Sequence, residues 1–190
     1  MLRKQLREKR GQLDMAARRL ASRQAAKLLA ASALFQASSH IACYVACRDE
    51  FNTLPIIQLI WQSGKKCYLP VISKDHEKQL DFFAYAENDS FILNQYGIPE
   101  PDTAKKIQFP GDQLDLVLVP LIGFDLRCHR LGTGGGYYDR SFAFLLTQPK
   151  PETPCLVGLG YEFQEINEVP VDSWDVPLDG VLTERKFFLI

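Results

Sequence analysis

Residues 130–140 combine the side chains and glycines that phosphate chemistry needs. The run reads Arg-Leu-Gly-Thr-Gly-Gly-Gly-Tyr-Tyr-Asp-Arg. Glycine lets backbone N–H groups approach a ligand with no Cβ in the way, and successive N–H groups in such a loop form an anion-binding nest. Arginines beside the nest can hold phosphate oxygens, and Asp139 can hold the Mg²⁺ that accompanies a nucleotide. These residue types predict a triphosphate-binding loop, followed by a helix over residues 137–146 whose dipole would attract a phosphate.

Known phosphate-binding motifs differ from this run. A Walker A loop needs a lysine after its glycines, and none follows here. A Rossmann fingerprint needs Gly-x-Gly-x-x-Gly, but Tyr137 stands three residues after Gly134. The alternative interpretation is a surface turn whose aromatic side chains pack on the core. Such a turn rarely combines arginine, glycines, two tyrosines and an aspartate, and we therefore favour a ligand site.

Composition and charge limit the possible classes of protein. The 190 residues fit one domain, and the 46% hydrophobic and 24% charged content is ordinary for a soluble globular protein. A formal net charge of −1 gives no whole-surface attraction for nucleic acid or an anionic membrane, so any polyanion site must be local. No apolar run approaches the roughly 18 residues of a membrane-spanning helix. We expect neither nucleic acid nor membrane as a partner.

The cysteines indicate a reducing compartment. Their number, five, is odd, no two form a Cys-x-x-Cys pair, and the three histidines do not complete a zinc-type cluster. Residues 1–24 are arginine-rich like an organelle transit peptide, but Glu8 and Asp14 oppose that interpretation, and a secretory signal would need an apolar stretch. Free thiols in the cytosol are the plain interpretation, and we expect a cytoplasmic protein.

A basic, amphipathic helix is expected at the start of the chain. Leu2, Leu6 and Leu13 fall at helical spacing. Arg3 and Arg7 stand four residues apart and therefore share a face. A basic run of this kind is usually only a solvated helix face, so a ligand contact here needs further support.

The rest of the chain alternates between strands and helices. Asp14 is suited to cap an alanine-rich helix that runs to about Phe35, and Thr53 to cap a helix that Gly64 ends. Strands are expected over residues 40–46, 66–72, 80–85, 91–93, 114–119 and 155–159 and from residue 181 on, with residues 97–102 as a rigid loop. This alternation predicts an α/β fold with a mostly parallel sheet and helices on both sides.

The predicted sheet places two loops at one rim. In mostly parallel sheets, ligands bind beyond the carboxyl ends of the strands. Glu50 follows the first strand, and residues 121–136 follow the strand at 114–119, whose unbroken aliphatic run suits a position buried on both faces. We therefore expect Glu50 and the glycine loop to open onto the same rim.

Three motifs, in this order, carry a resemblance to a known family: Asp115-Leu-Val-Leu-Val-Pro120, Gly123-Phe-Asp125 and the Arg130 to Arg140 run. On these residues the chain resembles the 5-formyltetrahydrofolate cyclo-ligase family, also called methenyltetrahydrofolate synthetase. Further matches cover most of the chain. They are the basic start with Leu6-Arg7, Tyr44 to Glu50 before Thr53, Gly97-Ile-Pro-Glu-Pro101, Val157-Gly-Leu-Gly-Tyr161 and Asp175 to Val181.

The resemblance implies a single three-layer α/β/α domain, Rossmann-like, over residues 1–190, and one reaction. ATP and 5-formyltetrahydrofolate would give 5,10-methenyltetrahydrofolate, ADP and phosphate. The formyl oxygen would attack the γ-phosphate, nitrogen 10 would close the ring, and phosphate would leave. We expect ATP and Mg²⁺ as co-substrate and cofactor, and a monomer, since no long apolar stripe is left unexplained.

The resemblance also implies roles for individual residues. The nucleotide would be bound by Arg3, Lys4, Arg7, Arg130, Leu131, Gly132, Thr133, Gly134, Gly135, Gly136, Tyr137 and Tyr138. The folate would be contacted by Val45, Glu50, Thr133, Gly134, Gly135, Gly136 and Tyr137. Asp139 and Asp175 would hold Mg²⁺, and Arg130 and Tyr137 would act in catalysis.

The chain departs from the family pattern at three positions. Leu121 and Cys128 stand where many members have glycine, which leaves the path of residues 121–129 open, and Arg3 stands where lysine is frequent, with Lys4 beside it. Each implied role also has a plainer alternative. Asp139 would be a helix-start acid, Asp175 a surface acid, Val45 a core residue and Glu50 a solvated turn acid.

Two other functions use similar features. A sugar-phosphate isomerase or acyl-CoA transferase has the same broad fold, but would need a catalytic carboxylate or cysteine and no ATP. A non-catalytic protein that binds a nucleotide or a folate would have the pocket but no catalytic activity. The intact run from Arg130 to Arg140 favours the cyclo-ligase over both.

Overall fold

The computed structural model describes residues 1–94, 97–147, 149 and 152–190. The helices are α1 (Leu2–Gly11), α2 (Met15–Ala30), α3 (Ala33–Ala37), α4 (Leu54–Gln62) and α5 (Tyr137–Ser141), with 3-10 helices η1 (Gly111–Gln113), η2 (Ala143–Leu146) and η3 (Glu162–Gln164). The strands are β1 (His40–Ala42), β2 (Lys66–Ile72), β3 (Leu80–Ala84), β4 (Phe91–Leu93), β5 (Pro99–Pro101), β6 (Gln108–Phe109), β7 (Leu116–Pro120), β8 (Gly123–Phe124), β9 (Arg130–Leu131), β10 (Cys155–Leu159), β11 (Gly180–Leu182) and β12 (Phe187–Leu189).

A parallel sheet forms the centre of the molecule. Within the described residues its strands lie in the order β12-β11-β10-β7-β1-β2-β3-β6. Strands β11, β10, β7, β1 and β2 run parallel, and antiparallel strands close both edges. Numbered among themselves, the parallel strands have the order 2-1-3-4-5, a doubly wound arrangement whose switch point lies between β1 and β7. The expected mostly parallel sheet is confirmed.

Strand β7 is buried on both faces because its aliphatic side chains alternate between two cores. Leu116 and Leu118 pack with residues of α2 and α4, whereas Val117 and Val119 pack with Phe142 and neighbours on the other face. The four β7 residues have no exposed surface. Each such side chain contributes roughly 1.5–3 kcal/mol when fully buried. The unbroken apolar run therefore holds the strand in the middle of the sheet.

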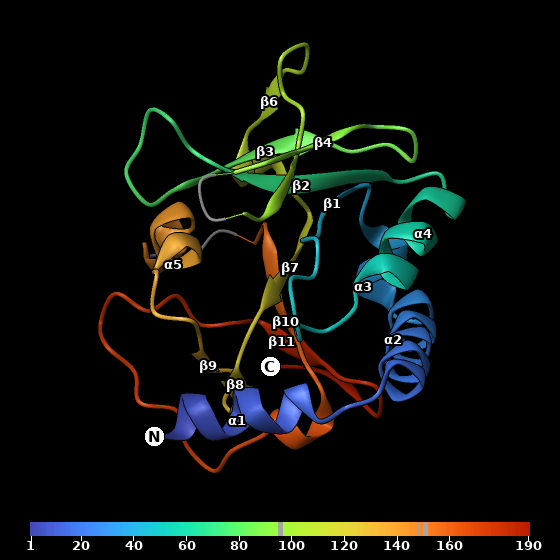
Figure 1. Cartoon of the computed structure of the whole chain (residues 1–190). Helices are drawn as coiled ribbons and strands as arrows, with labels where there is room; N and C mark the ends of the chain where they lie inside the picture. The colour runs from blue at the N-terminus through green and yellow to red at the C-terminus, as the bar shows by residue number, and fades with distance from the viewer. Residues whose placement is uncertain (95–96, 148, 150–151) are drawn as a thin grey trace.

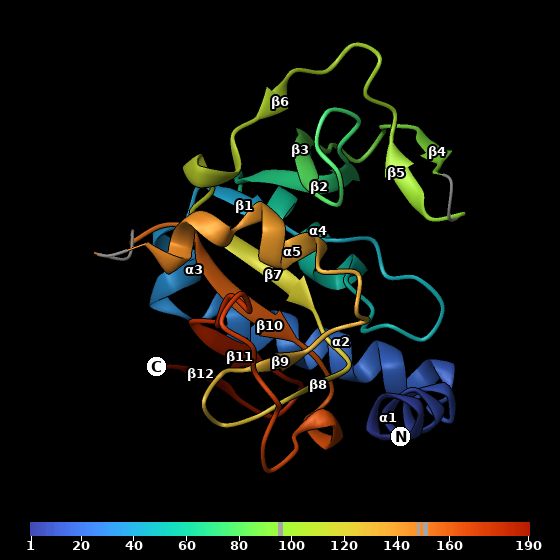
Figure 2. The same ribbon diagram turned by 90° about the vertical axis from the view of Figure 1, so that its left-hand side faces the viewer.

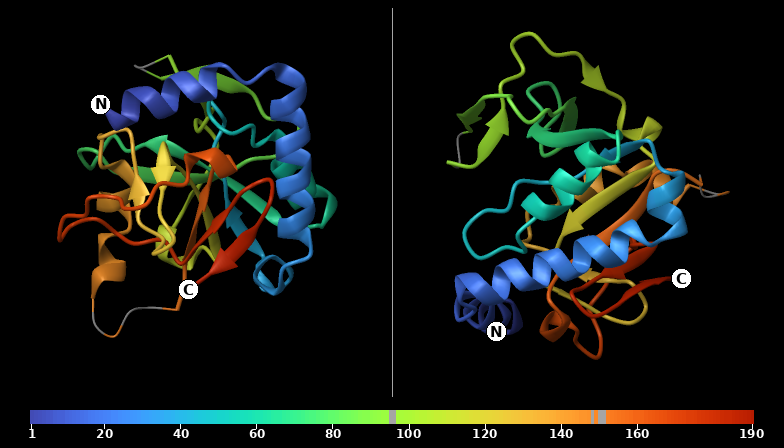
Figure 3. Two further views of the ribbon diagram at one scale, coloured as in Figure 1. Left: turned by 90° about the horizontal axis from the view of Figure 1, so that it is seen from below. Right: turned by 90° about the vertical axis from the view of Figure 1, so that its right-hand side faces the viewer.

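Helices cover the two faces of the sheet unequally. Figure 1 shows α2, α3 and α4 together on one face, and α5 with η2 on the other. Helix α1 lies below this assembly, and Figure 3 shows it at a large angle to α2. The small β4–β5 sheet stands at one corner of the molecule, beside β2 (Figure 2). Among the described residues, no helix combines the length and apolarity that crossing a membrane requires.

The predicted helix starts are mostly confirmed, and one predicted helix is wrong in its extent. The Asp14 side chain accepts an N–H bond at the start of α2, as expected. The helix predicted to reach Phe35 instead ends at Ala30, because the Ser32 hydroxyl caps a separate helix by accepting the Phe35 N–H at 3.1 Å. Thr53 begins α4, but its hydroxyl donates to the Tyr44 carbonyl at 2.6 Å rather than capping the helix.

Two strand predictions need correction. Strand β1 ends at Ala42 rather than at residue 46, because the chain leaves the sheet there to form the loop that carries Glu50. The predicted loop at 97–102 contains strand β5, which pairs with β4. Its prolines are tolerated because the pair is a small two-stranded edge. The buried Glu100 carboxylate accepts the Ile72 N–H at 3.1 Å and fixes β5 against β2.

Candidate active site

A pocket of about 670 Å³ lies beyond the carboxyl ends of β1 and β7, at the switch point of the sheet. Glu50 and residues 120–122 line it together with residues 129–140. Residues 170–177 close another side. The expectation that Glu50 and the glycine loop open onto one rim is therefore confirmed. The volume is within the usual range of roughly 300–1,000 Å³ for ligand sites.

The glycine loop takes a course that requires glycine at two positions. Gly134 has φ +99° and Gly136 has φ +68°, conformations that side-chain-bearing residues rarely adopt. Gly136 also precedes the first residue of α5. The predicted helix over 137–146 is wrong in its length. Helix α5 ends at Ser141, because the chain turns there to bury Phe142 completely in the core, and η2 follows.

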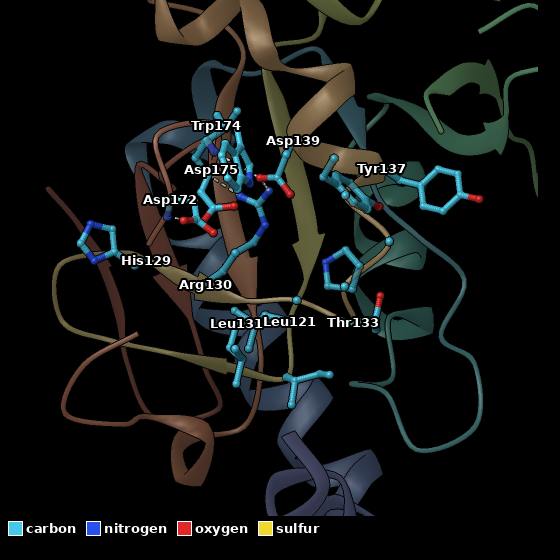
Figure 4. Close-up of a pocket in the computed structure, with 18 of the residues that line it drawn as sticks. Leu121, His129, Arg130, Leu131, Thr133, Tyr137, Asp139, Asp172, Trp174 and Asp175 are labelled. Carbon is cyan, nitrogen blue, oxygen red and sulfur yellow. Dashed lines mark hydrogen bonds and ion pairs between the residues drawn. The ribbon is translucent and has the colours of Figure 1, made fainter. Parts of the chain in front are cut away.

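Arg130 is fixed by two partners on the pocket wall. Its guanidinium forms an ion pair with the Asp139 carboxylate and donates a hydrogen bond to the Val176 carbonyl at 2.6 Å. The same Asp139 oxygen accepts the Val176 N–H at 3.1 Å. Figure 4 shows Arg130, Asp139 and Asp175 gathered on one side of the pocket, with Thr133 and Tyr137 on the other. Arg130 is therefore held in place before any ligand arrives.

Buried Asp125 holds the loop that leads to Arg130. Its carboxylate accepts N–H bonds from Arg127, His129 and Val169 at 2.9–3.0 Å, and its second oxygen lies 3.1 Å from His129 Nδ1. Burial acts to raise the pKa of Asp125, but these hydrogen bonds together hold it below its ordinary value. Cys128, within this loop, has φ +61°, a left-handed backbone conformation that favours glycine.

Asp175 lies at the end of a tight turn beside Arg130. Its carboxylate accepts the Asp172 N–H at 2.8 Å, and its own N–H donates to the Asp172 carbonyl at 3.0 Å. Because Val176, the next residue, bonds both Arg130 and Asp139, the turn is tied to the wall of the pocket that carries these two residues. The structure therefore brings the two aspartates that sequence reasoning singled out to one wall.

Glu50 and Arg10 also line the pocket. Burial raises the pKa of Glu50, and the hydrogen bond from the Cys47 N–H, 3.0 Å from Oε2, only partly offsets it. Arg10 is almost fully buried; its Nε lies 3.0 Å from an Asp49 carboxylate oxygen, and another nitrogen donates to the Leu121 carbonyl at 3.2 Å. Sequence reasoning missed Arg10, which links α1 to the loop that carries Glu50.

Helix α1 contacts the glycine loop through one of its predicted arginines. Arg3 lines the pocket, and its Nε donates to the Gly132 carbonyl at 2.9 Å. Leu6 anchors the helix in a small apolar cluster under the loop. Lys4 is exposed and pairs with Glu8 at 3.9 Å, and neither Lys4 nor Arg7 lines the pocket. Their predicted contacts with a nucleotide stay predictions.

The two tyrosines of the run have different surroundings. Tyr137 lines the pocket and extends towards its open side (Figure 4). Tyr138 also lines the pocket, but its ring stacks near Phe142 of the core, and burial raises the pKa of its hydroxyl. Val45 packs against the core and does not line the pocket. The remaining predicted residues, Leu131, Gly132, Thr133, Gly134, Gly135 and Gly136, all line it.

Several pocket residues besides Arg10 were absent from the predicted site, among them Lys78 and Trp174. Lys78, in the turn between β2 and β3, lines the pocket near α5, and nothing in its neighbourhood in the sequence marks it. Trp174 also lines the pocket. Its position next to the predicted metal ligand Asp175 was a usable signal, because an aromatic side chain beside a charged site often contacts a ligand.

Comparisons with known proteins agree with the geometry. The model of the 5-formyltetrahydrofolate cyclo-ligase family matches residues 1–184. The 5-formyltetrahydrofolate cyclo-ligases of Escherichia coli K12 and Haemophilus influenzae are 34% and 37% identical to the chain, over 77% and 76% of its length and 78% and 75% of theirs.

Solved structures give the same result. The 5,10-methenyltetrahydrofolate synthetase of Aquifex aeolicus has a TM-score of 0.80 at 28% identity, covering 99% of this chain and 90% of that one. The synthetase of Mycoplasma pneumoniae has a TM-score of 0.71 at 25% identity, covering 96% of each chain. With a family match over nearly its whole length, relatives above 30% identity and the expected pocket at the switch point, the chain belongs to the 5-formyltetrahydrofolate cyclo-ligase family.

Proposed function

We propose that the protein converts 5-formyltetrahydrofolate and ATP into 5,10-methenyltetrahydrofolate, ADP and phosphate. The observation that supports this most strongly is that one pocket joins the glycine loop and Arg130 to the partly buried carboxyl of Glu50. An anion-binding loop and a hydrogen-bond acceptor for a polar ring are what a phosphorylated donor and a pterin require.

The chemistry explains why both substrates must share this pocket. The formyl oxygen of the folate attacks the γ-phosphorus of ATP, the bond from phosphorus to the bridging oxygen breaks, and ADP leaves. Nitrogen 10 then attacks the activated formyl carbon and loses its proton, and the carbon–oxygen bond breaks as phosphate leaves. An amide oxygen is a poor leaving group, whereas phosphate is a good one. Phosphorylation of the formyl oxygen therefore supplies the leaving group that ring closure needs.

The chain's own residues act mainly by positioning and by balancing charge. Phosphoryl transfer depends on holding donor and acceptor in line and on stabilising charge at the transferring group. Arg130 is fixed by Asp139 and Val176 and therefore presents its charge to the phosphates without reorganisation. Backbone N–H groups of residues 132–136 provide further donors. Tyr137 borders the loop on the folate side, and Glu50 accepts N–H donors of the pterin.

Asp139 and Asp175 fit a site for Mg²⁺. One oxygen of each carboxylate accepts a backbone N–H, from Val176 and Asp172 respectively, and within the described residues the other oxygen has no hydrogen bond. Mg²⁺ is usually held by one or two carboxylates together with water and substrate phosphates. The described residues contain no group of three or more possible metal ligands, and a site completed by a nucleotide needs none. A bound Mg²⁺ would neutralise phosphate charge.

A coupled assay tests the proposal. Purified protein is mixed with Mg²⁺, ATP and 5-formyltetrahydrofolate, and the near-ultraviolet absorbance of the methenyl product is followed together with ADP. We expect one ADP per methenyl product and no product when ATP is omitted. Binding of both compounds without any product would identify a binding protein instead and overturn the proposal.

We further propose that the enzyme works as a monomer in the cytoplasm. The five cysteines are free thiols in the structure, which suits a reducing compartment. The pocket is formed by residues of one chain, so that catalysis needs no second copy. Sedimentation at micromolar concentration in the presence of ATP measures the oligomeric state.

A further inference from the structure

Trp174 is a large aromatic side chain exposed at the rim of the pocket. Its exposed fraction is 65%, although it lines the same cavity as Arg130 and Asp139. The other tryptophan, Trp61, lies on α4 away from the pocket and donates its ring N–H to the Tyr85 carbonyl at 2.9 Å. The indole of Trp174 is thus available to a ligand.

The backbone under Trp174 is held on both sides. Before it, Asp172 is bonded to Asp175 through two hydrogen bonds that close the turn. After it, Val176 bonds both Arg130 and Asp139. The indole is therefore carried on a turn that is tied directly to the residues expected to hold the phosphates and Mg²⁺. Figure 4 shows Trp174 beside Asp175 on that side.

The position of Trp174 distinguishes it from the folate side of the pocket. In the sheet, β1 lies on one side of β7, and β10 and β11 lie on the other. Glu50 follows β1, whereas Trp174 precedes β11, and Figure 1 shows the two connecting segments on opposite sides of β7. A pterin held by Glu50 and a ring held by Trp174 would occupy different parts of the cavity.

The surroundings of Trp174 suit a flat ring. Val171 and Leu146, both partly exposed, line the same pocket, together with Pro170 and Pro177. A pocket that combines such apolar side chains with Arg130 and the glycine loop matches a molecule with a ring at one end and phosphates at the other. Base–aromatic stacking is favourable for every nucleobase because each has a π face.

We propose that Trp174 is the stacking platform for the nucleobase of the nucleotide. The inference rests on the proposed function, because it takes the phosphates to lie on Arg130 and the glycine loop. Trp174 would fix the direction in which the nucleotide leaves the phosphate site, away from the folate. It would contribute to nucleotide affinity without contacting the reacting atoms.

Nucleotide binding by a Trp174→Ala variant tests the inference in an otherwise unchanged chain. Because the side chain is largely exposed, the variant should fold. By calorimetry, we expect the Kd for a non-hydrolysable ATP analogue to rise roughly 5- to 150-fold, the factor that loss of one stacking contact produces. The Kd for inorganic tripolyphosphate should not change, and Trp174→Phe should retain most of the affinity.

Fluorescence gives a second, independent measurement. In a Trp61→Phe variant, emission comes from Trp174 alone, since the chain has two tryptophans. Saturable quenching by the ATP analogue, absent with tripolyphosphate, supports stacking. If Trp174→Ala weakens both ligands equally or neither, or if the folate alone quenches Trp174, the inference is wrong while the proposed function stands. If the wild-type chain binds no nucleotide and forms no product, both fall.

Discussion

Arg130 and Asp139 form an ion pair that is bridged by the backbone of one residue, since the Val176 carbonyl accepts a hydrogen bond from Arg130 and the Val176 N–H donates one to Asp139. The three groups connect the first residue of β9, the first turn of α5 and the segment before β11. An arginine held in this way combines charge with a fixed direction, which lysine cannot reproduce because it lacks the planar fork.

Replacing Arg130 by alanine should reduce turnover by about 10³-fold or more, because an arginine on a transferring phosphoryl group contributes on that scale. Arg130→Lys should recover little of the loss. The initial rate of methenyl formation at saturating substrates measures both. Arg127→Ala is the matched control, since Arg127 is exposed, pairs with Glu168 and does not line the pocket. Turnover near the wild-type rate for Arg130→Ala would remove this residue from the mechanism.

Replacing Asp139 by asparagine should increase the Mg²⁺ concentration needed for half-maximal rate. The loss of an outer-shell partner alone typically costs about 10–100-fold in metal affinity, so we expect a shift of roughly tenfold or more. Titration of the rate with Mg²⁺ at fixed ATP gives the value. Exposed Asp112, remote from the pocket, provides the control Asp112→Asn. An unchanged Mg²⁺ titration for Asp139→Asn would contradict the ligand assignment.

The Glu50 carboxyl gives a prediction about pH and stability. Because burial raises its pKa from the ordinary value of 4.5, the folded chain holds this proton more tightly than the unfolded chain. The free energy of unfolding therefore falls as the pH rises from about 4.5, the ordinary pKa, through the raised pKa of the folded state. In Glu50→Gln this loss should be absent, and the variant should gain thermal stability relative to the wild type between pH 4.5 and pH 7.

The same Glu50→Gln variant should bind the folate more weakly. Loss of a charge-assisted hydrogen bond costs about 1.5–3 kcal/mol, which corresponds to a roughly 10- to 150-fold higher KM for 5-formyltetrahydrofolate. The KM for ATP should change little. Thermal unfolding followed at several pH values, together with the two KM values, separates the effects. An unchanged KM for the folate would mean that Glu50 does not contact the substrate.

Cys128 allows a test of backbone strain. The alanine and glycine variants both lose the buried thiol, but only glycine relieves the strain of φ +61°. Left-handed backbone costs a residue with a Cβ roughly 1–2 kcal/mol, so Cys128→Gly should be more stable than Cys128→Ala by about 1 kcal/mol. At Cys67, inside β2, the order should reverse, since glycine weakens a strand by roughly 0.5–1 kcal/mol. Denaturant unfolding of the four variants measures both differences.

The sequence predicted the features that depend on local pattern or chain order. The buried strand β7 and the shared rim of Glu50 and the glycine loop both followed from hydrophobic runs and from the geometry of parallel sheets. The bounds of β2 and β10 were also predicted correctly. These features are fixed by residues near one another in the sequence, or by a topological rule.

Other features depend on contacts between distant residues. The N-terminal helix carries several basic residues, and only the position of Asp49 shows that Arg10 is the one turned into the protein. Likewise, nothing local indicates that Phe142 becomes fully buried and shortens the helix after the glycines. The strand at Pro99–Pro101 exists because Glu100 bonds a distant strand. Tertiary packing therefore decides which side chain is buried and where these helices and strands begin and end.

The contact between Arg3 and Gly132 has a practical consequence for making the protein. Met1 is fully exposed and lies two residues from Arg3, which lines the pocket, so an affinity tag fused there would begin close to the site. The other end of the chain follows β12, the outer strand of the sheet, and Figure 2 shows the two ends on opposite sides of the molecule. Affinity tags and immobilisation linkers should therefore be fused after Ile190.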